Sequence, residues 1–229
     1  MKDPYVLEDG TLKNLLGITD YNELRQAEKD IAFVNLISAR SELKKEMGID
    51  LIKDVHKHIF QDIYPWAGEF RTTPIYKEEL VIPGLSLEYT SPKNIEMELN
   101  SRLKDLNSYK WEGIGVDQIA EQLTHHLAKI WRVHPFRDGN TRTTLTFAEI
   151  FAKQHGFELD LGNLLDNLDR IYDQKTGKVL RYSVRDKFVL AALDEKDYPE
   201  PEHLKAIIKE SIHLGINKKI ESLNEMLER

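Results

Sequence analysis

The sequence predicts an all-α fold, a helical domain interrupted by one small β-hairpin or flap. Two observations support this prediction. Apolar residues recur at helical spacing along most of the 229-residue chain, between helix-start and helix-stop residues. Residues 64–92 break the pattern, because prolines and glycines separate short runs of β-branched and aromatic residues there. No internal repeat or long linker interrupts the chain, which favours a single core.

The first two helices are predicted in residues 20–63. Asp20, with Glu23 three positions later, is typical of a capping box at a helix start. We expect this helix to end at Gly48. Its apolar positions are Leu24, Ala27, Ile31, Val34 and Leu36. The next helix, within residues 49–63, has one apolar face, formed by Leu51, Ile52, Val55, Ile59 and Phe60.

Further helices are predicted after the interrupted segment. Ser91 and Pro92 suit the N-cap and first position of a helix. Its apolar face is Ile95, Leu99, Leu103 and Leu106, and a helix over 117–131 has Ile119, Leu123, Leu127 and Ile130. Helices are also expected within 141–156, 181–193 and 201–214, with a charged amphipathic segment over 217–229.

Composition excludes several classes of protein. The chain is 41% hydrophobic, which is typical of a folded globular protein. Its net charge of -7 disfavours a general nucleic-acid binder. It has no cysteine, so disulfides, thiolate zinc sites and cysteine nucleophiles are excluded. The N-terminus lacks a signal-peptide pattern and no apolar run suits a membrane span, so we expect a cytoplasmic protein without membrane partners.

Residues 133–144, VHPFRDGNTRTT, are suited to binding an anion. One helix is predicted to end near Val133 and the next to begin at Asn140 or Thr141, so free amides lie at the second helix start. Gly139 lets the backbone approach a ligand closely. Arg142 is unfavourable in a first helical turn unless an anion lies beside it, which its guanidinium can bind.

Two more side chains of this stretch suit phosphoryl or nucleotidyl transfer. Asp138 stands beside the predicted anion site, where a carboxylate, phosphate oxygens and waters commonly bind Mg²⁺. His134 can act as a general base near neutral pH. Each residue alone also fits a structural role, as a packing histidine, a turn or a surface charge. Their joint occurrence favours a transfer site.

The segment HPFRDGNTR resembles the signature of Fic-domain proteins, His-x-Phe-x-(Asp/Glu)-Gly-Asn-(Gly)-Arg-x-x-(Arg). DIYPWAGEFRTTPIYK is similar to the family segment that leads into its flap, and YTSPKNIEMEL to the helix start that follows. The similarity spans residues 15–195. It implies a helical fold with a β-hairpin flap, with the Fic domain at residues 1–195 and a C-terminal helical extension at 196–229.

The resemblance also implies AMPylation, the transfer of AMP from ATP to a Ser, Thr or Tyr hydroxyl of a target protein, with release of pyrophosphate. His134 would deprotonate the hydroxyl, and Asp138 would hold Mg²⁺. The residues implied in nucleotide and phosphate binding are Gly139, Asn140, Thr141 and Arg142. The flap residues implied in docking the target by strand addition are Ile75, Tyr76 and Lys77.

The sequence departs from the family pattern in two places. Thr141 stands where the family often has glycine, which narrows the anion site. Leu145 occupies the position of the second arginine in the family signature, a residue that in many relatives holds the γ-phosphate. Many members are inhibited by a (Ser/Thr)-x-x-x-Glu-(Gly/Asn) helix, internal or on a separate antitoxin. The nearest internal match is Ser38 to Glu42, but Leu43 follows it.

Other functions remain open at this point. One alternative is a degenerate Fic scaffold that binds nucleotide or a partner without turnover, and another is a Fic enzyme with altered nucleotide or phosphate transfer. Leu145 favours both. A metal-dependent hydrolase using His125, His126, His134 and Asp138 is disfavoured. Adjacent helical side chains diverge by about 100°, so His125 and His126 cannot bind one metal together.

Overall fold

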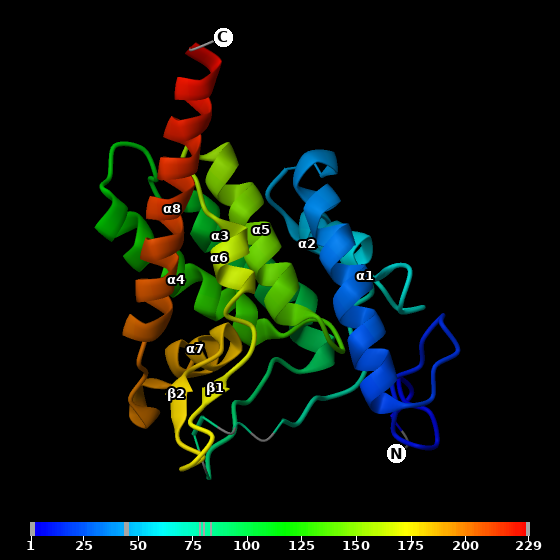
Figure 1. The fold of residues 1–229 in the computed structure, drawn as a ribbon. Coiled ribbons are helices and arrows are strands. Elements are labelled where there is room, and N and C mark those ends of the chain that lie inside the picture. Colours follow the sequence, from blue (N-terminus) through cyan, green and yellow to red (C-terminus); the bar gives the residue numbers. More distant parts are fainter. Residues whose placement is uncertain (1–2, 44–45, 78, 80, 83, 228–229) are drawn as a thin grey trace.

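The computed structural model describes residues 3–43, 46–77, 79, 81–82 and 84–227, and confirms the predicted all-α fold (Figure 1). The first part contains α1 (Tyr21–Glu42), α2 (Ile49–Phe60), α3 (Ile95–Ser108), α4 (Val116–Val133) and α5 (Asn140–Gln154). The second part contains α6 (Leu161–Leu165), β1 (Ile171–Tyr172), β2 (Val179–Arg181), α7 (Val184–Ala191) and α8 (Glu202–Leu227). Short 3₁₀ helices lie at Pro92–Asn94 and Glu195–Asp197.

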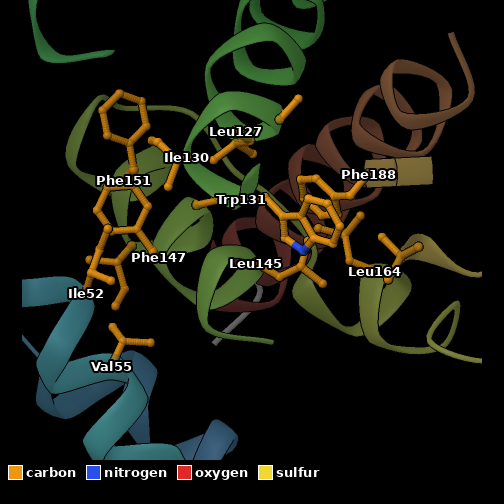
Figure 2. Close-up of a cluster of buried hydrophobic side chains, with 14 of the residues drawn as sticks. Ile52, Val55, Leu127, Ile130, Trp131, Leu145, Phe147, Phe151, Leu164 and Phe188 are labelled. Atoms are coloured by element: carbon orange, nitrogen blue, oxygen red, sulfur yellow. The ribbon is translucent and has the colours of Figure 1, made fainter. Parts of the chain in front are cut away.

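Helix α5 lies at the centre of the fold, against α1 and α2 on one side and α4 and α6 on the other (Figure 1). It is buried on most of its circumference because apolar residues occupy more than one face. Figure 2 shows Leu145, Phe147 and Phe151 of α5 among buried side chains of α2, α4 and α7. This packing fixes the start of α5, and therefore the loop before it, against several other helices.

Most predicted apolar faces are confirmed as core. The predicted apolar residues of α2, α3 and α4 are all buried. Asp20 caps α1 as expected, since its Oδ1 accepts a hydrogen bond from Glu23 N at 2.8 Å. Two details of α1 were wrong. The helix ends at Glu42 and Gly48 instead precedes α2, and Val34 is 64% exposed and does not belong to the core.

The small antiparallel sheet is present, but its position was predicted wrongly. Strands β1 and β2 pair between α6 and α7, with Ile171 opposite Arg181. The described part of residues 64–92, where a small hairpin or flap was expected, contains no strand, and residues 78, 80 and 83 of this segment lie outside the described chain. The β1–β2 turn is stabilised locally, because Asp173 Oδ1 accepts hydrogen bonds from the amides of Lys175 and Thr176.

Helix α8 joins two segments that the sequence suggested separately, 201–214 and 217–229. Its first half packs on α4 and α7, where Leu204, Ile208 and Ile212 are buried. Its last turns extend beyond the other helices (Figure 1), and Leu223 is 51% exposed there. Among the described residues, no helix combines the length and apolar character needed to cross a membrane.

Candidate active site

The loop between α4 and α5 has an unusual backbone at both ends. His134, the C-cap of α4, has a φ of 50°, and Gly139, the N-cap of α5, has a φ of 77°. Only glycine adopts this left-handed region without strain. A Cβ at Gly139 would also lie 2.3 Å from the ring of Phe60 on α2. Glycine is therefore required at this position for two independent reasons.

The side chain of Asn140 closes this loop. Its Oδ1 accepts a hydrogen bond from Phe136 N at 2.9 Å, and its Nδ2 donates to Phe136 O at 2.9 Å. Phe136 itself is fully buried and anchors the loop, as predicted. The first helical hydrogen bond of α5 runs from Thr143 N to Gly139 O. The amides of residues 140–142 precede it, so the helix itself offers them no acceptor, and a helix start of this kind is suited to binding an anion.

A cavity of about 510 Å³ brings most of the predicted site residues together. From the loop and α5 it is lined by His134, Asp138, Gly139, Asn140, Thr141 and Arg142. Lys77 of the predicted flap also lines it, whereas Tyr76 is 92% exposed and Ile75 packs on the core. Residues of α1, Leu168 and Asp169 after α6, and Arg185 of α7 also line it. The cavity has the size of a nucleotide or small-ligand pocket.

Ser38 and Glu42 lie apart from this cavity. Ser38 Oγ is 2.7 Å from His58 Nε2, and Glu42 Oε2 is 4.0 Å from His58 Nδ1. These contacts connect α1 with α2, and neither residue is among those that line the cavity. An inhibitory role for Ser38 and Glu42 stays a prediction.

His134 is held as a neutral imidazole. Its ring is 2% exposed, stacks on Tyr89 at 4.0 Å and packs edge-on against Trp131 at 5.0 Å. Burial lowers the pKa of His134 well below its usual value, and the positive charges of Lys77 and Arg185 lower the pKa further. A neutral imidazole keeps a lone pair that can accept a proton. His134 therefore has the protonation state of a general base.

Asp138 is held as a carboxylate. Burial by itself raises its pKa, but Lys77, Arg142 and the hydrogen bond from Gly139 N outweigh it, so the pKa is lowered. Gly139 N donates to Asp138 Oδ1 at 2.6 Å, which fixes the side chain at the cavity. A single ionised carboxylate beside an anion site fits Mg²⁺, which takes its remaining ligands from phosphate and water. Within the described parts of the chain, no cluster of three or more His, Asp or Glu could hold a metal alone.

Arg142 has partners that the sequence did not reveal. Its guanidinium is 2.5 Å from Glu28 Oε1 of α1 and lies over the Phe60 ring at 4.6 Å. Glu28 also accepts a hydrogen bond from the hydroxyl of Tyr64. Both side chains of the ion pair are less than one-fifth exposed. Arg142 is thus oriented before any ligand binds, and no local pattern in α1 marks Glu28 as its partner.

Leu145 lies in the core rather than at the cavity. It is fully buried, and Figure 2 shows it in the cluster that contains Trp131 and Phe188. Helix α5 therefore presents only one arginine, Arg142, to the cavity. Other cations that line the cavity are Arg25, Lys29, Lys77 and Arg185.

Arg71 connects the α4–α5 loop with residues 73–90, part of the segment that was predicted as a flap. Arg71 is 2% exposed, and its Nε donates to His134 O at 2.8 Å. Its terminal nitrogens donate to the carbonyls of Thr73, at 2.9 Å, and Thr90. One buried side chain therefore joins both ends of the segment 73–90 to the α4–α5 loop. The sequence offered no signal for this role beyond the position of Arg71 shortly after a turn at residues 65–68.

An ion pair between a buried carboxylate, Glu79, and the partly exposed Arg185 joins the same segment to α7. Glu79 is 1% exposed, and its Oε2 is 2.7 Å from Arg185 Nη1. The Tyr89 hydroxyl donates to Glu79 Oε1 at 2.7 Å, and the Tyr89 ring stacks on His134. The imidazole is thereby packed against a side chain that is itself fixed by hydrogen bonding.

Comparison with known proteins agrees with these features. A model of the Fic/DOC family matches residues 46–152, which include the loop and most of α5. The probable protein adenylyltransferase y4lH of Sinorhizobium fredii is 31% identical over 157 residues, which cover 67% of this chain and 76% of that protein. Protein adenylyltransferase VbhT of Bartonella schoenbuchensis is 28% identical over 160 residues, which cover 69% of this chain but 32% of VbhT.

Solved structures show the same fold. The BepC protein of Bartonella tribocorum, with bound AMPPNP, has a TM-score of 0.70 and 20% identity, covering 90% of this chain and 95% of that one. The N-terminal FIC domain of Bep8 from Bartonella sp. 1-1C also has a TM-score of 0.70, with 19% identity, covering 91% and 94%. The signature loop, the helical architecture around it and the similarity to y4lH together establish that this chain belongs to the Fic/DOC family.

Proposed function

We propose that this protein is a protein adenylyltransferase, which transfers AMP from ATP to a hydroxyl of a target protein. One observation carries the proposal: a neutral imidazole, an ionised carboxylate and the free amides of a helix start line the same cavity. These are the parts needed to bind a triphosphate and to accept the proton of an attacking hydroxyl. The relatives named protein adenylyltransferases support the same activity.

The transfer follows from this arrangement. The phosphates of ATP bind at the amides of residues 140–142, with Arg142 beside them. His134 accepts the proton of the target hydroxyl as its oxygen attacks the α-phosphorus. A bond forms between the target oxygen and the α-phosphorus. The bond between the α-phosphorus and the oxygen that bridges the α- and β-phosphates breaks, and pyrophosphate leaves. Asp138 would hold Mg²⁺, which when bound neutralises phosphate charge.

The segment containing Ile75, Tyr76 and Lys77 is proposed to dock the target protein. The main chain is already bonded at Thr72 and Thr73, by the Tyr5 hydroxyl and by Arg71. Residues 74–77 form no strand in the described structure, which leaves this stretch as the place for an added strand. The Tyr76 side chain is 92% exposed, and Lys77 reaches the cavity. A peptide paired along this segment would bring its hydroxyl toward His134.

The direct experiment uses ATP labelled at either the α- or the γ-phosphate, incubated with the protein and a cell lysate. AMP transfer predicts α-label on protein and γ-label in released pyrophosphate. Label on protein from γ-labelled ATP alone would indicate kinase-like transfer. ATP binding without label from either position would support the scaffold alternative, in which the site binds nucleotide without turnover.

The Asp138→Ala variant is expected to lose Mg²⁺-dependent transfer by about a hundredfold or more, because the carboxylate that would hold the metal is removed. Its stability should change by less than about 1 kcal/mol, since within the described structure the carboxylate accepts a hydrogen bond from the neighbouring Gly139 amide and from no other group. Asp194→Ala, which removes an exposed carboxylate paired with Arg132, is the control. A large fall in melting temperature for Asp138→Ala would instead indicate a structural residue.

Transfer is also expected to show no acid loss between about pH 6 and 8, measured as kcat/KM against pH. The pKa of His134 lies well below its usual value, so the imidazole remains unprotonated across this window. Activity should fall only as the pH drops toward the lowered pKa, where the base becomes protonated. A tenfold decline per pH unit beginning near pH 6.5 would contradict this protonation state.

A further inference from the structure

His56 of α2 is completely buried beneath the catalytic loop. Its ring stacks on Phe136 with centroids 3.8 Å apart and planes inclined by 15°. It also contacts the rings of Phe60 and Trp66, at 4.8 and 5.8 Å. An apolar side chain could fill this position without burying polar atoms. Because burying the two nitrogens of a histidine is unfavourable unless they are hydrogen-bonded, their partners explain why a histidine is tolerated here.

Both ring nitrogens of His56 have backbone partners. Gly68 N donates to Nδ1 at 2.8 Å, so Nδ1 carries the lone pair. The proton of the neutral ring is therefore on Nε2, which lies 3.1 Å from Asp138 O and donates to it. The ring of His56 thus accepts a hydrogen bond from the turn that contains Gly68 and donates one to the α4–α5 loop at Asp138.

The approach of Gly68 depends on the absence of a side chain. Gly68 has a φ of 82°, and a Cβ there would lie 2.9 Å from Lys57 Cβ and 3.2 Å from Lys53 O of α2. The turn can therefore pack closely against α2, so that the amide of Gly68 donates its hydrogen bond to His56 Nδ1. The tautomer of His56 is fixed by this close packing.

We propose that His56 is a positioning residue for the phosphate-binding end of α5, acting through the Asp138 carbonyl. In a trans peptide the carbonyl and the following N–H point in opposite directions. Because His56 draws the Asp138 carbonyl into the core, the Gly139 N–H is turned the other way, toward the side chain of Asp138 and the cavity. That the ligand at this helix end is a phosphate group rests on the proposed function.

The test compares side chains that differ in reach. In His56→Gln the amide nitrogen lies near the former Nε2 and can still donate to Asp138 O. In His56→Asn the shorter side chain places its amide near the former Nδ1, so it cannot donate a hydrogen bond to Asp138 O. His56→Phe retains the ring and its stacking but neither hydrogen bond. His126→Phe is the matched control, because His126 is also a nearly buried histidine among aromatic rings, in α4 and outside the cavity lining.

Hydrogen exchange of residues 134–145 is measured first, in the protein without nucleotide. We expect exchange of this segment to be about tenfold faster in His56→Asn and His56→Phe, as the loss of one ordinary hydrogen bond implies. His56→Gln should remain within about threefold of the parent, and His126→Phe should match it. If His56→Phe does not fold, the Gln and Asn pair still decides the question.

Binding of ATP with Mg²⁺, measured by calorimetry on the same proteins, should weaken about tenfold in His56→Asn and recover in His56→Gln. Equal loop exchange in the Gln and Asn variants, or parent-like exchange in His56→Phe, would overturn the proposal. Because exchange is measured without nucleotide, it tests His56 even if no AMP transfer occurs. Absence of α-label from the parent protein would count against the proposed function alone.

Discussion

The His134→Ala variant is expected to transfer α-label from ATP to protein between about a hundred and ten thousand times more slowly than the parent, the usual contribution of a general base. The variant removes the neutral imidazole at the cavity and leaves the amides of α5 in place. ATP binding should therefore persist while turnover is lost. Initial rates of labelling, together with calorimetric ATP binding, separate the two effects.

His155→Ala provides the control for His134→Ala, because His155 follows the far end of α5 and contacts Phe151 and Trp111 rather than the cavity. It should label protein at the parent's rate. Equal rates for His134→Ala and the parent would show that another group accepts the proton. Loss of ATP binding in His134→Ala would show that the ring supports the pocket rather than the chemistry.

The Arg71→Met variant is expected to lower the free energy of unfolding by roughly 3–5 kcal/mol and to reduce transfer strongly. Methionine fills similar apolar space but leaves the carbonyls of Thr73, Thr90 and His134 without their donor. The bond to the His134 carbonyl is buried and those to Thr73 and Thr90 are partly buried, so losing the donor is costly. The ends of segment 73–90 would also no longer be joined to the loop. Denaturant unfolding measures the first effect, and α-label transfer the second.

Arg132→Met is the matched control for Arg71→Met. Arg132 also donates to a backbone carbonyl, that of Ala192, but its other partner is the half-exposed Asp194. Such a pair contributes little, so this variant should lose about 1 kcal/mol or less. If Arg71→Met were no less stable than Arg132→Met, the hydrogen bonds of Arg71 would not hold the loop and the segment 73–90 together.

The helices were predictable from the sequence because their signals are local. Asp20 caps α1 through an amide three residues away, and the apolar faces of α2, α3 and α4 repeat at helical spacing. The loop was predictable for the same reason, since His134, Asp138, Gly139 and Arg142 lie within one short stretch. The chemistry that we propose for them follows from residue type and from their place at a helix start.

The partners of these residues were not predictable, because they come from distant parts of the chain. Glu28 lies 114 residues from Arg142, and His56 lies 82 residues from Asp138. Which side chain meets which depends on how α1, α2 and α5 pack, and single-sequence periodicity does not contain that information.

The sheet was misplaced for a related reason. Residues 72–90 have strand-like composition, but Arg71 and Glu79 tie that segment to other parts of the fold. Short strands instead form at β1 and β2, around a turn closed by Asp173 and Gly177. A tertiary contact overrode the local preference in the first segment, and a local turn decided the second.

A crystal structure with a non-hydrolysable ATP analogue and Mg²⁺ would show directly whether a nucleotide binds at the start of α5. We predict phosphate oxygens within hydrogen-bond distance of the amides of residues 140–142, the α-phosphorus facing His134, and the metal on Asp138. The opposite result would be a nucleotide bound elsewhere, or this cavity left empty at saturating ligand with the imidazole turned away from it.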